Sequence, residues 1–348
     1  MIEAINTTNS QWLNLITNNS DGGDILQSAE FGESKTANGW RGLKFKFSSE
    51  EYLNYFLVLE KKTLLGKIWY IPKGPGITDV AVLSEFISEI KDYAAKRGVI
   101  FIKIEPPIDA KLAPEIEKLK LNISRTKNIQ PNSSTVIVDL KPEVDDILAS
   151  FKQRTRRSIR KAEKSGVVVE AVEPNEANLK KFYNLYSLTG ERAGFFIRPL
   201  GYYLRFWHIF GSSKMANLYF AKTGSGIVAA AMVLHGSSKA LYKDGASDRN
   251  IMPEGSPYLL QWEIIKDLKA RGIKEYDLHG TPPEDELDDK SHPFYSLGVF
   301  KTAFSDKVTS TVGAYDIIVN DRKYKLWQKF GLRAYQAWAH RIKKSTFY

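Results

Sequence analysis

The chain has 348 residues, a formal net charge of +10 and no cysteine. Its length suits two domains of ordinary size, and the lack of cysteine excludes disulfides, thiolate metal sites and a cysteine nucleophile. The five histidines lack ligand spacing, so no metal is expected. The first residues do not resemble a signal peptide, and the longest apolar run, residues 227–234, is too short to span a bilayer. We therefore expect a soluble cytoplasmic protein, and the excess of cations predicts an anionic partner.

The first half of the chain is predicted to form three strands, a turn, a helix and a further strand. The helical pattern at residues 80–97 ends before Gly98, which suits a helix C-terminus. The turn is IPKGPG, where Gly and Pro interrupt regular structure. The predicted strands lie at residues 41–47, 55–61, 67–72 and 101–106.

The second half repeats this order of elements. A hairpin around GSG is followed by a third strand, the turn MPEGSP, a helix at residues 257–271 and a further strand. The segment KDYAAKRGV of the first half returns as KDLKARGI in the second. One such echo can be chance, but the agreement of several elements in order favours a duplicated unit. The predicted strands lie at residues 216–222, 227–235, 240–245 and 275–280.

The repeated layout is typical of acetyltransferase-like folds of the GNAT type. The predicted fold class is α/β, with mixed α+β-like sheets in two tandem GNAT-like domains. The first domain is expected at residues 1–140, completed by a basic, aromatic helix at 321–348 that packs back on it. The second domain is expected at residues 141–320. For the C-terminal helix, binding to a membrane surface is the alternative.

The second domain is predicted to open with a strongly basic helix that runs from Pro142 to Gly166. Seven cations lie between residues 152 and 164, against one acid, which exceeds what a helix dipole needs. Two interpretations stay open: a solvated helix face, or a docking surface for the phosphates of a nucleic acid or an anionic membrane. The opposite stripe is predicted to pack on the core through Leu148, Phe151, Thr155, Ile159 and Ala162.

Several motifs of nucleotide and ester chemistry are missing from the sequence. The chain has no GxxxxGK[ST] phosphate loop, no GxGxxG after a strand and no GxSxG elbow. The loop that would hold the pyrophosphate of coenzyme A is missing from both predicted domains. An acyltransferase fold without this loop indicates another activated acyl donor.

An ordered set of motifs between about residues 26 and 316 resembles the FemABX peptidyltransferases. LQSAEFGESKTANGW is similar to the opening motif of that family, YIPKGPG to its Tyr-x-Pro-x-Gly-Pro, and FIKIEPP to its strand that ends in an acid and Pro. QRTRRSIRKAEKSGVVV and YSLTGERAGFFIRPLGYY resemble the central motifs, and YDLHG and LGVFKTAFSDKVTSTVGAYD the closing ones. The ordered set is more specific than any one motif.

This resemblance implies a defined reaction as well as two GNAT-like domains. The family transfers an amino acid from aminoacyl-tRNA to an amine of the peptidoglycan stem peptide, and so builds cell-wall cross-bridges. An aminoacyl ester is already activated, so no cofactor, ATP or metal is expected. The chain has no room for the helical hairpin of long members and resembles compact ones, some of which use a soluble UDP-linked muropeptide. Whether the acceptor is UDP-linked or lipid-linked stays open, and we expect a monomer with peripheral membrane contact.

Two other functions stay open at this point. One is a nucleic-acid-binding protein without catalysis, in which the basic helix is the whole function. The other is a GNAT-like enzyme that acylates a different amine. The chain shows no RRM, KH or helix-turn-helix signature, which argues against the first alternative.

The matched motifs imply roles for individual residues. Lys301, next to Phe300, occupies the functional Phe-Lys position of the family and is predicted to stabilise the oxyanion or to hold the tRNA end. Lys35, Arg198 and Tyr202 match positions that hold the muropeptide diphosphate.

Other assignments rest on weaker matches or on charge. Glu105 and Tyr242 are predicted acceptor contacts, although the family often has Asp at the first position and an aromatic residue near Asp244. His279 follows a predicted strand, and we interpret it as structural rather than as a base. The predicted tRNA contacts on the basic helix are Arg156, Arg157, Arg160 and Lys161.

Overall fold

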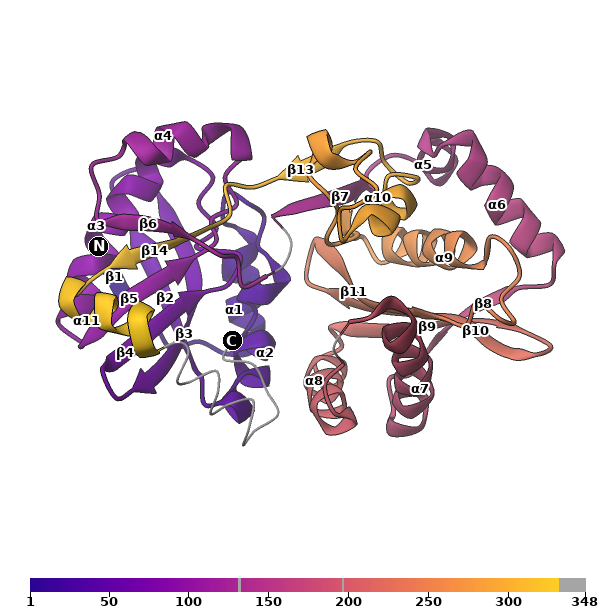
Figure 1. Ribbon diagram of the computed structural model, residues 1–348, viewed down its shortest axis with the longest axis horizontal. Helices are drawn as coiled ribbons and strands as arrows, with labels where there is room; N and C mark the ends of the chain where they lie inside the picture. The colour runs from indigo at the N-terminus through magenta and orange to yellow at the C-terminus, as the bar shows by residue number, and fades with distance from the viewer. Residues whose placement is uncertain (131–132, 196, 332–348) are drawn as a thin grey trace. The chain divides into compact units, whose positions relative to one another are not determined.

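The computed structural model describes residues 1–130, 133–195 and 197–331 (Figure 1). The chain divides into two compact units. The first comprises Met1–Ser133 and the described residues from Ser310 onward, and the second comprises Ser134–Thr309. Each unit is built on one seven-stranded sheet.

The first sheet has the strand order β1-β2-β3-β4-β5-β14-β6. Neighbouring strands pair antiparallel, except β4 and β5, which pair in parallel. A parallel pair needs a crossover connection, and α3 (Val80–Ala95) supplies it. The strands are β1 (Ile2–Ala4), β2 (Arg41–Ser48), β3 (Leu53–Thr63), β4 (Gly66–Ile71), β5 (Val99–Ile104), β6 (Ile123–Thr126) and β14 (Ala314–Ile318). The other helices of this unit are α1 (Asn9–Thr17), α2 (Ala29–Ser34), α4 (Ala113–Lys118) and α11 (Asp321–Leu326).

α3 forms where the sequence predicts a helix, for local reasons. Asp79 precedes it, and its side chain accepts a hydrogen bond from the backbone N–H of Val82 at 3.0 Å. Leu83, Phe86 and Ile90 recur at helical spacing and are fully buried in the core of the first unit. This apolar stripe holds α3 against the sheet.

The second sheet has the order β13-β7-β12-β11-β10-β9-β8, with β11 and β12 paired in parallel through the crossover helix α9 (Ser256–Ala270). α6 and α9 cover one face of this sheet, and α7 and α8 cover the other (Figure 1). The strands are β7 (Ser134–Asp139), β8 (Val168–Val172), β9 (Ala216–Thr223), β10 (Gly226–His235), β11 (Lys239–Ser247), β12 (Glu275–Asp277) and β13 (Val308–Ser310). The other helices are α5 (Val144–Ser150), α6 (Gln153–Lys164), α7 (Glu176–Ala193), α8 (Leu200–Ser212) and α10 (Tyr295–Lys301).

The two units share one order of elements, as the sequence predicts. The series β2-β3-β4-α3-β5 of the first unit corresponds to β9-β10-β11-α9-β12 of the second. In both, the strand after the helix pairs in parallel with the last strand before it. The predicted fold class, mixed α/β in two tandem GNAT-like units, is confirmed.

The observed division of the chain differs from the predicted boundaries at two strands. β7 was placed in the first domain by the boundary at residue 140, but it pairs with β12 of the second sheet. β14 was placed in the second domain by the boundary at residue 320, but it lies between β5 and β6 of the first sheet. Both strands pair with partners that are distant in sequence. The pattern of neighbouring residues does not predict such pairing.

The basic segment forms two helices, so the prediction of one continuous helix from Pro142 to Gly166 is wrong. α5 ends at Ser150, and α6 begins at Gln153. Between them Phe151 adopts an extended backbone, and its buried ring packs against Trp262 and Phe304 at centroid distances of 5.6 and 5.2 Å. Burial of this aromatic ring against two others stabilises the break, because such ring pairs contribute beyond the area that they bury. The predicted stripe of α6 is buried at Thr155, Ile159 and Ala162.

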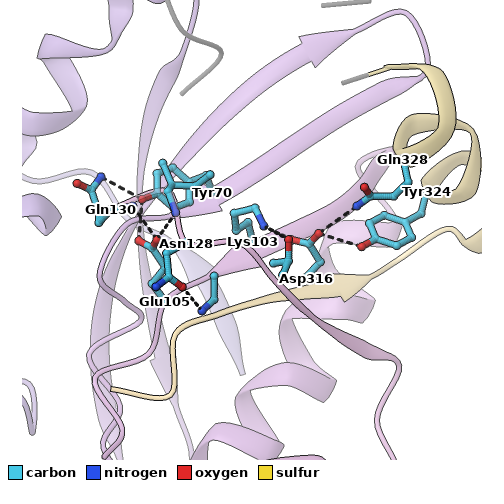
Figure 2. Close-up of polar contacts among 11 residues, drawn as sticks. Tyr70, Lys103, Glu105, Asn128, Gln130, Asp316, Tyr324 and Gln328 are labelled. Carbon is cyan, nitrogen blue, oxygen red and sulfur yellow. Dashed lines mark hydrogen bonds and ion pairs between the residues drawn. The ribbon is translucent and has the colours of Figure 1, made fainter. Parts of the chain in front are cut away.

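The C-terminal segment packs on the first unit through a buried polar cluster, shown in Figure 2. The Lys103 ammonium on β5 lies 2.7 Å from Asp316 on β14, and both side chains are buried. The Tyr324 hydroxyl on α11 donates to the other oxygen of Asp316 at 2.9 Å, and the Tyr324 ring contacts Phe101 on β5. The described part of this segment, as far as Gly331, lies in the first unit. The rest of the predicted helix, with Tyr335 and Trp338, lies outside the described residues.

Among the residues that the structure describes, no helix has both the length and the apolar character needed to cross a membrane.

Candidate functional site

The parallel strands of the second sheet pair only briefly. β11 pairs with β12 over three residues that end at Leu241, and it then continues along β10. A bulge follows immediately, because the pairing with β10 skips Lys243 between Tyr242 and Asp244. Bulges are frequent beside active sites, where they change the direction of a side chain. Side chains of β11 beyond Leu241 and the loop after β12 therefore lie where the two parallel strands separate.

Lys301 is held at this loop. It is the last residue of α10, and only 5% of its surface is exposed. Its Nζ donates to the backbone carbonyls of His279 and Gly280, both at 2.7 Å. Within the described part of the chain the third N–H of the ammonium has no acceptor, so one donor is left for a ligand. His279, interpreted from the sequence as structural, contributes its backbone carbonyl here, and its backbone is left-handed with φ 61°.

The charge of Lys301 is adjusted by its surroundings. Burial lowers the pKa of the ammonium to about 8, although the nearby Asp277 carboxylate raises it. Asp277 is held in turn by the Thr135 hydroxyl and the backbone N–H of His279. Because the folded pKa lies below that of a solvated lysine, the charged side chain opposes folding below about pH 8. A buried cation with such a depressed pKa is typical of a functional group.

Phe300, the neighbour of this lysine in the sequence, is half-buried. Its ring lies 5.1 Å from Tyr258 and 5.5 Å from Phe304, measured between centroids. The cluster packs against the core of the second unit. These contacts fix α10, so we assign Phe300 to positioning Lys301.

Tyr242 lies in a buried polar chain. Its phenol hydrogen-bonds to Gln261 on α9, whose Oε1 accepts from the Tyr276 hydroxyl at 2.8 Å. The ring passes directly over Gly245, where an added Cβ would lie 1.6 Å from the Tyr242 oxygen. Glycine at 245 is therefore required for this orientation of Tyr242, which remains a predicted ligand contact.

Arg198 and Tyr202 are brought together as predicted. Pro199 precedes α8, and the Arg198 guanidinium lies 4.5 Å from the centre of the Tyr202 ring. The Arg198 carbonyl accepts from the Tyr183 hydroxyl at 3.0 Å, which holds the backbone before the helix. Stacking orients the planar guanidinium, a geometry that suits recognition of phosphate oxygens.

Lys35 lies in the first unit, where a second lysine accompanies it. Lys35 caps the C-terminus of α2 and is nearly buried, with its ammonium 4.9 Å from the Phe31 ring. Lys61 on β3 is 3% exposed, and its ammonium lies 4.9 Å from the Trp40 ring. The backbone N–H of Trp40 donates to the backbone carbonyl of Lys35 at 3.3 Å, which ties these two residues together through the main chain. Sequence reasoning missed Lys61, because a lysine in a strand usually faces solvent.

A pocket lies next to Lys35 in the same unit. It is lined by the ring of Trp40, by the cations Arg41 and Lys44, and by Gly32 and Gly42, among others. The two glycines approach closely, since a Cβ on Gly32 would lie 3.6 Å from the Gly42 Cα. The lining also includes the acid Glu33, and the Lys44 ammonium donates to the Thr7 carbonyl at 2.9 Å.

Glu105 is engaged by the protein itself (Figure 2). Its Oε1 accepts from the backbone N–H groups of Ile129 and Gln130 at 2.7 and 2.9 Å. Its Oε2 accepts from the Tyr70 hydroxyl at 2.7 Å and from the Lys73 N–H at 3.3 Å. A carboxylate has about four acceptor sites, and these four donors use them. We therefore assign Glu105 to holding two loops together, not to acceptor binding.

We expect Glu105→Gln to lower the free energy of unfolding by about 2–4 kcal/mol, because the amide would turn an NH₂ group toward buried donors. Urea denaturation measures this change. Glu117→Gln is the control: its exposed ion pair with Arg125 spans 3.8 Å, so the variant should lose no more than about 0.5 kcal/mol. A raised acceptor KM with unchanged stability would return Glu105 to the acceptor site.

The four predicted tRNA contacts of α6 differ in their surroundings. Arg156 donates to two backbone carbonyls at the end of α5, one of them at 2.7 Å, and so caps that helix. Lys161 pairs with Glu254. Arg157 and Arg160 are exposed and have no ion-pair partner among the residues described. The structure thus leaves Arg157 and Arg160 as the two available for phosphate.

No group of three or more histidine or acidic side chains in the described residues is arranged to hold a metal ion.

The two units share the tandem GNAT-like layout, and in the second unit a buried lysine lies where the parallel strands β11 and β12 separate. The chain belongs to the FemAB family, whose sequence model matches residues 9–124, 119–224 and 219–330. The resemblance found in the motifs is thus confirmed, and the chain is an aminoacyltransferase, as predicted.

The known relatives are distant in sequence but match over nearly the whole chain. The lipid II:glycine glycyltransferase of Staphylococcus haemolyticus is 24% identical, over 93% of this chain and 95% of that protein. The lipid II:glycine glycyltransferase of Staphylococcus epidermidis is 22% identical, over 94% and 95%.

Solved structures share the fold. The crystal structure of FemX superposes with a TM-score of 0.80 at 21% identity, covering 94% of this chain and 99% of that one. The C-terminal domain of a putative lysylphosphatidylglycerol synthetase from Agrobacterium fabrum gives a TM-score of 0.51 at 16% identity, covering 93% and 96%.

Proposed function

We propose that this aminoacyltransferase moves an amino acid from aminoacyl-tRNA to an amine of a peptidoglycan precursor stem peptide, and so builds cell-wall cross-bridges. The observation that carries the proposal is the Lys301 ammonium, buried and fixed by two carbonyls with one donor left over. Membership of the FemAB family and relatives named lipid II:glycine glycyltransferase support it.

The reaction needs a fixed positive charge more than a cofactor. The neutral amine attacks the ester carbonyl of the donor, a C–N bond forms, and the carbonyl oxygen becomes an oxyanion. The ester C–O bond then breaks, the amine loses a proton, and the ribose hydroxyl of the tRNA gains one. A preorganised donor such as Lys301 stabilises the oxyanion without reorganisation, which is typically worth roughly 3–4 kcal/mol.

We propose that the tRNA donor docks on α6. Arg157 and Arg160 are exposed on the face opposite the buried stripe of Thr155 and Ile159. Exposed arginines bind phosphates through paired N–H groups, and each phosphate neutralised releases counterions. A nucleic-acid-binding protein without catalysis is no longer a competing reading, because the chain is an aminoacyltransferase.

We propose two separate contributions to binding the diphosphate of the muropeptide, as the matched motifs imply: Arg198 with Tyr202 in the second unit, and Lys35 in the first. The stacked guanidinium of Arg198 and the partly shielded ammonium of Lys35 are cations of the kind that phosphate oxygens require. The relatives named for lipid II favour a lipid-linked acceptor, whereas the missing helical hairpin resembles the compact members of the family, some of which use a UDP-linked one. Both carry a diphosphate, so these residues serve either acceptor.

Lys35→Ala and Arg198→Ala are each expected to raise the acceptor KM about tenfold, with a smaller fall in kcat. The diphosphate does not react, so its binding energy should be equal in the ground state and the transition state. Initial rates at varied acceptor concentration measure both constants. Lys91→Ala in α3 is the control, since it lies outside the proposed site. Unchanged acceptor KM in both variants would contradict the diphosphate role.

We further propose that the protein acts as a monomer that touches the membrane surface through its C-terminal segment. Residues 321–348 contain eight cations and one acid. Leu326 and Phe330 are 48% and 58% exposed beside these cations, a combination that favours an anionic lipid surface. Co-sedimentation with anionic and with zwitterionic vesicles tests this contact, and sedimentation velocity tests the monomer.

The decisive test of the proposed function is a transfer assay with mixed charged tRNA. UDP-linked and lipid-linked muropentapeptide are supplied in separate reactions, and the products are weighed by mass spectrometry. A mass increase of one amino-acid residue is expected, and its value identifies the amino acid. The preferred acceptor follows from the two rates. No mass increase with either acceptor, while another amine is acylated, would replace this function by acylation of that amine.

A further inference from the structure

A buried carboxylate beside the bulge of β11 has one oxygen without a hydrogen-bond partner among the described residues. Asp244 is only 8% exposed. Its Oδ1 accepts from the Tyr186 hydroxyl at 3.1 Å and lies 3.4 Å from the Lys243 Nζ. Its Oδ2 is buried and has no hydrogen-bond partner in the part of the chain that the structure describes. Both donors therefore reach the same oxygen.

The unused oxygen needs an explanation. A buried acceptor without a partner is costly, and the cost is larger for a charged group. Such exceptions in native proteins usually mark a functional group, an ordered water or a ligand. The ligand must donate hydrogen bonds, because an ionised carboxylate can only accept them.

The surroundings of Asp244 favour a cation. Tyr186, Tyr203 and Tyr242 lie within electrostatic reach, since burial and the charge of Asp244 both raise their pKa values. These phenols therefore stay neutral, and one of them, Tyr186, donates its hydroxyl to the carboxylate. The rings of Tyr186 and Tyr203 are perpendicular at 5.7 Å, and Phe195 lies 5.5 Å from Tyr186. A carboxylate among neutral aromatic rings attracts a cation that also donates hydrogen bonds.

The protein itself shows which kind of cation reaches this carboxylate. Lys243, the residue that the bulge leaves unpaired, brings a primary ammonium to the Oδ1 of Asp244. The Lys243 side chain is 29% exposed, so the ammonium that meets Oδ1 is itself partly solvated. A metal ion needs more ligands than one carboxylate, and the described residues contain no cluster for it.

We propose that Asp244 binds a primary ammonium group of a substrate through its Oδ2. The identity of that substrate rests on the proposed function, which supplies two candidates: the α-ammonium of the aminoacyl donor and the side-chain ammonium of the stem peptide. Either would form a charge-assisted hydrogen bond to Oδ2 beside the tyrosine rings. Asp244 is thus a specificity-determining residue, because it favours a free amino group over an acylated one.

Binding of paired, non-reacting probes tests this site. One pair is a stable amide analogue of aminoacyl-adenosine with a free α-amine and its N-acetylated form. The other pair is UDP-linked muropentapeptide with a free and an N-acetylated stem amine. Calorimetry should show that the wild-type protein binds the free form of one pair about tenfold more tightly, and that Asp244→Asn brings this ratio close to one. The pair whose free form binds more tightly to the wild type, and loses this preference in Asp244→Asn, identifies the source of the ammonium.

A matched carboxylate provides the control. Asp267 also accepts from a tyrosine, Tyr219, at 2.5 Å, and it pairs with Arg271 at 2.8 Å on the same oxygen. Asp267→Asn should leave the ratios for both pairs unchanged, and thermal unfolding confirms that each variant is folded.

Three results overturn the proposal. They are equal binding of free and acetylated probes by the wild type, binding of neither form, and an ammonium preference that survives Asp244→Asn. The first would mean that Oδ2 holds only a water molecule. If the ammonium preference is intact but the transfer assay gives no product, the proposed function fails and this site stands.

Discussion

Lys301→Met should reduce the turnover of aminoacyl transfer by a factor on the order of 10²–10³ while the protein still folds. Two carbonyls hold the Lys301 ammonium at 2.7 Å, so it meets the developing oxyanion without having to reorient. Methionine keeps the length and the apolar stem of the side chain but removes the charge. Single-turnover rates with saturating donor and acceptor measure the chemical step directly.

A second lysine in the same unit serves as the matched control. The Nζ of Lys269 also donates to two backbone carbonyls, those of Leu140 and Lys141, at 3.3 Å. Lys269→Met removes the same kind of contact away from the site, so it should leave turnover within about twofold of the wild type. Equal losses in both variants would mean that Lys301 acts only on stability, and near wild-type turnover in Lys301→Met would remove it from the mechanism.

The pKa of Lys301 adds a pH signature to this prediction. Burial lowers that pKa to about 8, so the ammonium is present below this pH and is lost as the pH rises through it. The rate of transfer should therefore fall on the alkaline side with an apparent pKa near 8. Lys301→Arg keeps the charge at higher pH, because a guanidinium is not deprotonated in this range. The decrease in the transfer rate of this variant at alkaline pH should occur at higher pH than in the wild type, even if its maximal rate is lower.

Charge reversal at Arg157 and Arg160 should weaken binding of the tRNA donor by at least about tenfold and flatten its salt dependence. Each phosphate contact contributes about one unit to the slope of log affinity against log salt, so losing two contacts should reduce that slope by roughly two. Filter binding of charged tRNA between low and moderate salt measures both quantities. Binding of the small muropeptide should not change.

The choice of residues and the control for this experiment come from the structure. Arg156 caps α5, and Lys161 pairs with Glu254, so reversing either would disturb the fold or a local ion pair. Lys118→Glu with Lys120→Glu changes the net charge by the same amount at exposed positions of the first unit. If both double variants lose tRNA affinity equally, the effect is that of net charge alone. Unchanged affinity in the α6 variant would make this helix a solvated face.

The sequence determined the repeated elements because their causes are local. The stripe of Leu83, Phe86 and Ile90 and the stop at Gly98 define α3 from neighbouring residues alone. The same holds for α9 and for the strands of both meanders. The ordered motifs determined the family, and with it the positions of Lys301, Arg198 and Tyr202.

The surroundings of the site residues could not be predicted from neighbouring residues in the sequence. Glu105 looked like a free acid beside a proline, yet four donors from two distant loops use its oxygens. Lys61 looked like a solvated strand lysine, yet it is buried near Trp40. Asp244 looked like a departure from the motif, yet it is a buried carboxylate among tyrosines of two other elements. In each case the partners come from parts of the chain that only folding brings near.

The helix break at Phe151 and the placement of β7 and β14 in sheets other than the predicted ones have the same physical origin. Phe151 leaves helical geometry because its ring packs between Trp262 and Phe304, and β7 and β14 join sheets whose other strands lie far away in sequence. Periodicity reports only the preferences of neighbouring residues, which decide where helices and strands begin and end. Strand pairing between distant segments decides which sheet a strand joins. Long-range packing decides where a helix is interrupted by a buried aromatic residue and which charged side chains are buried.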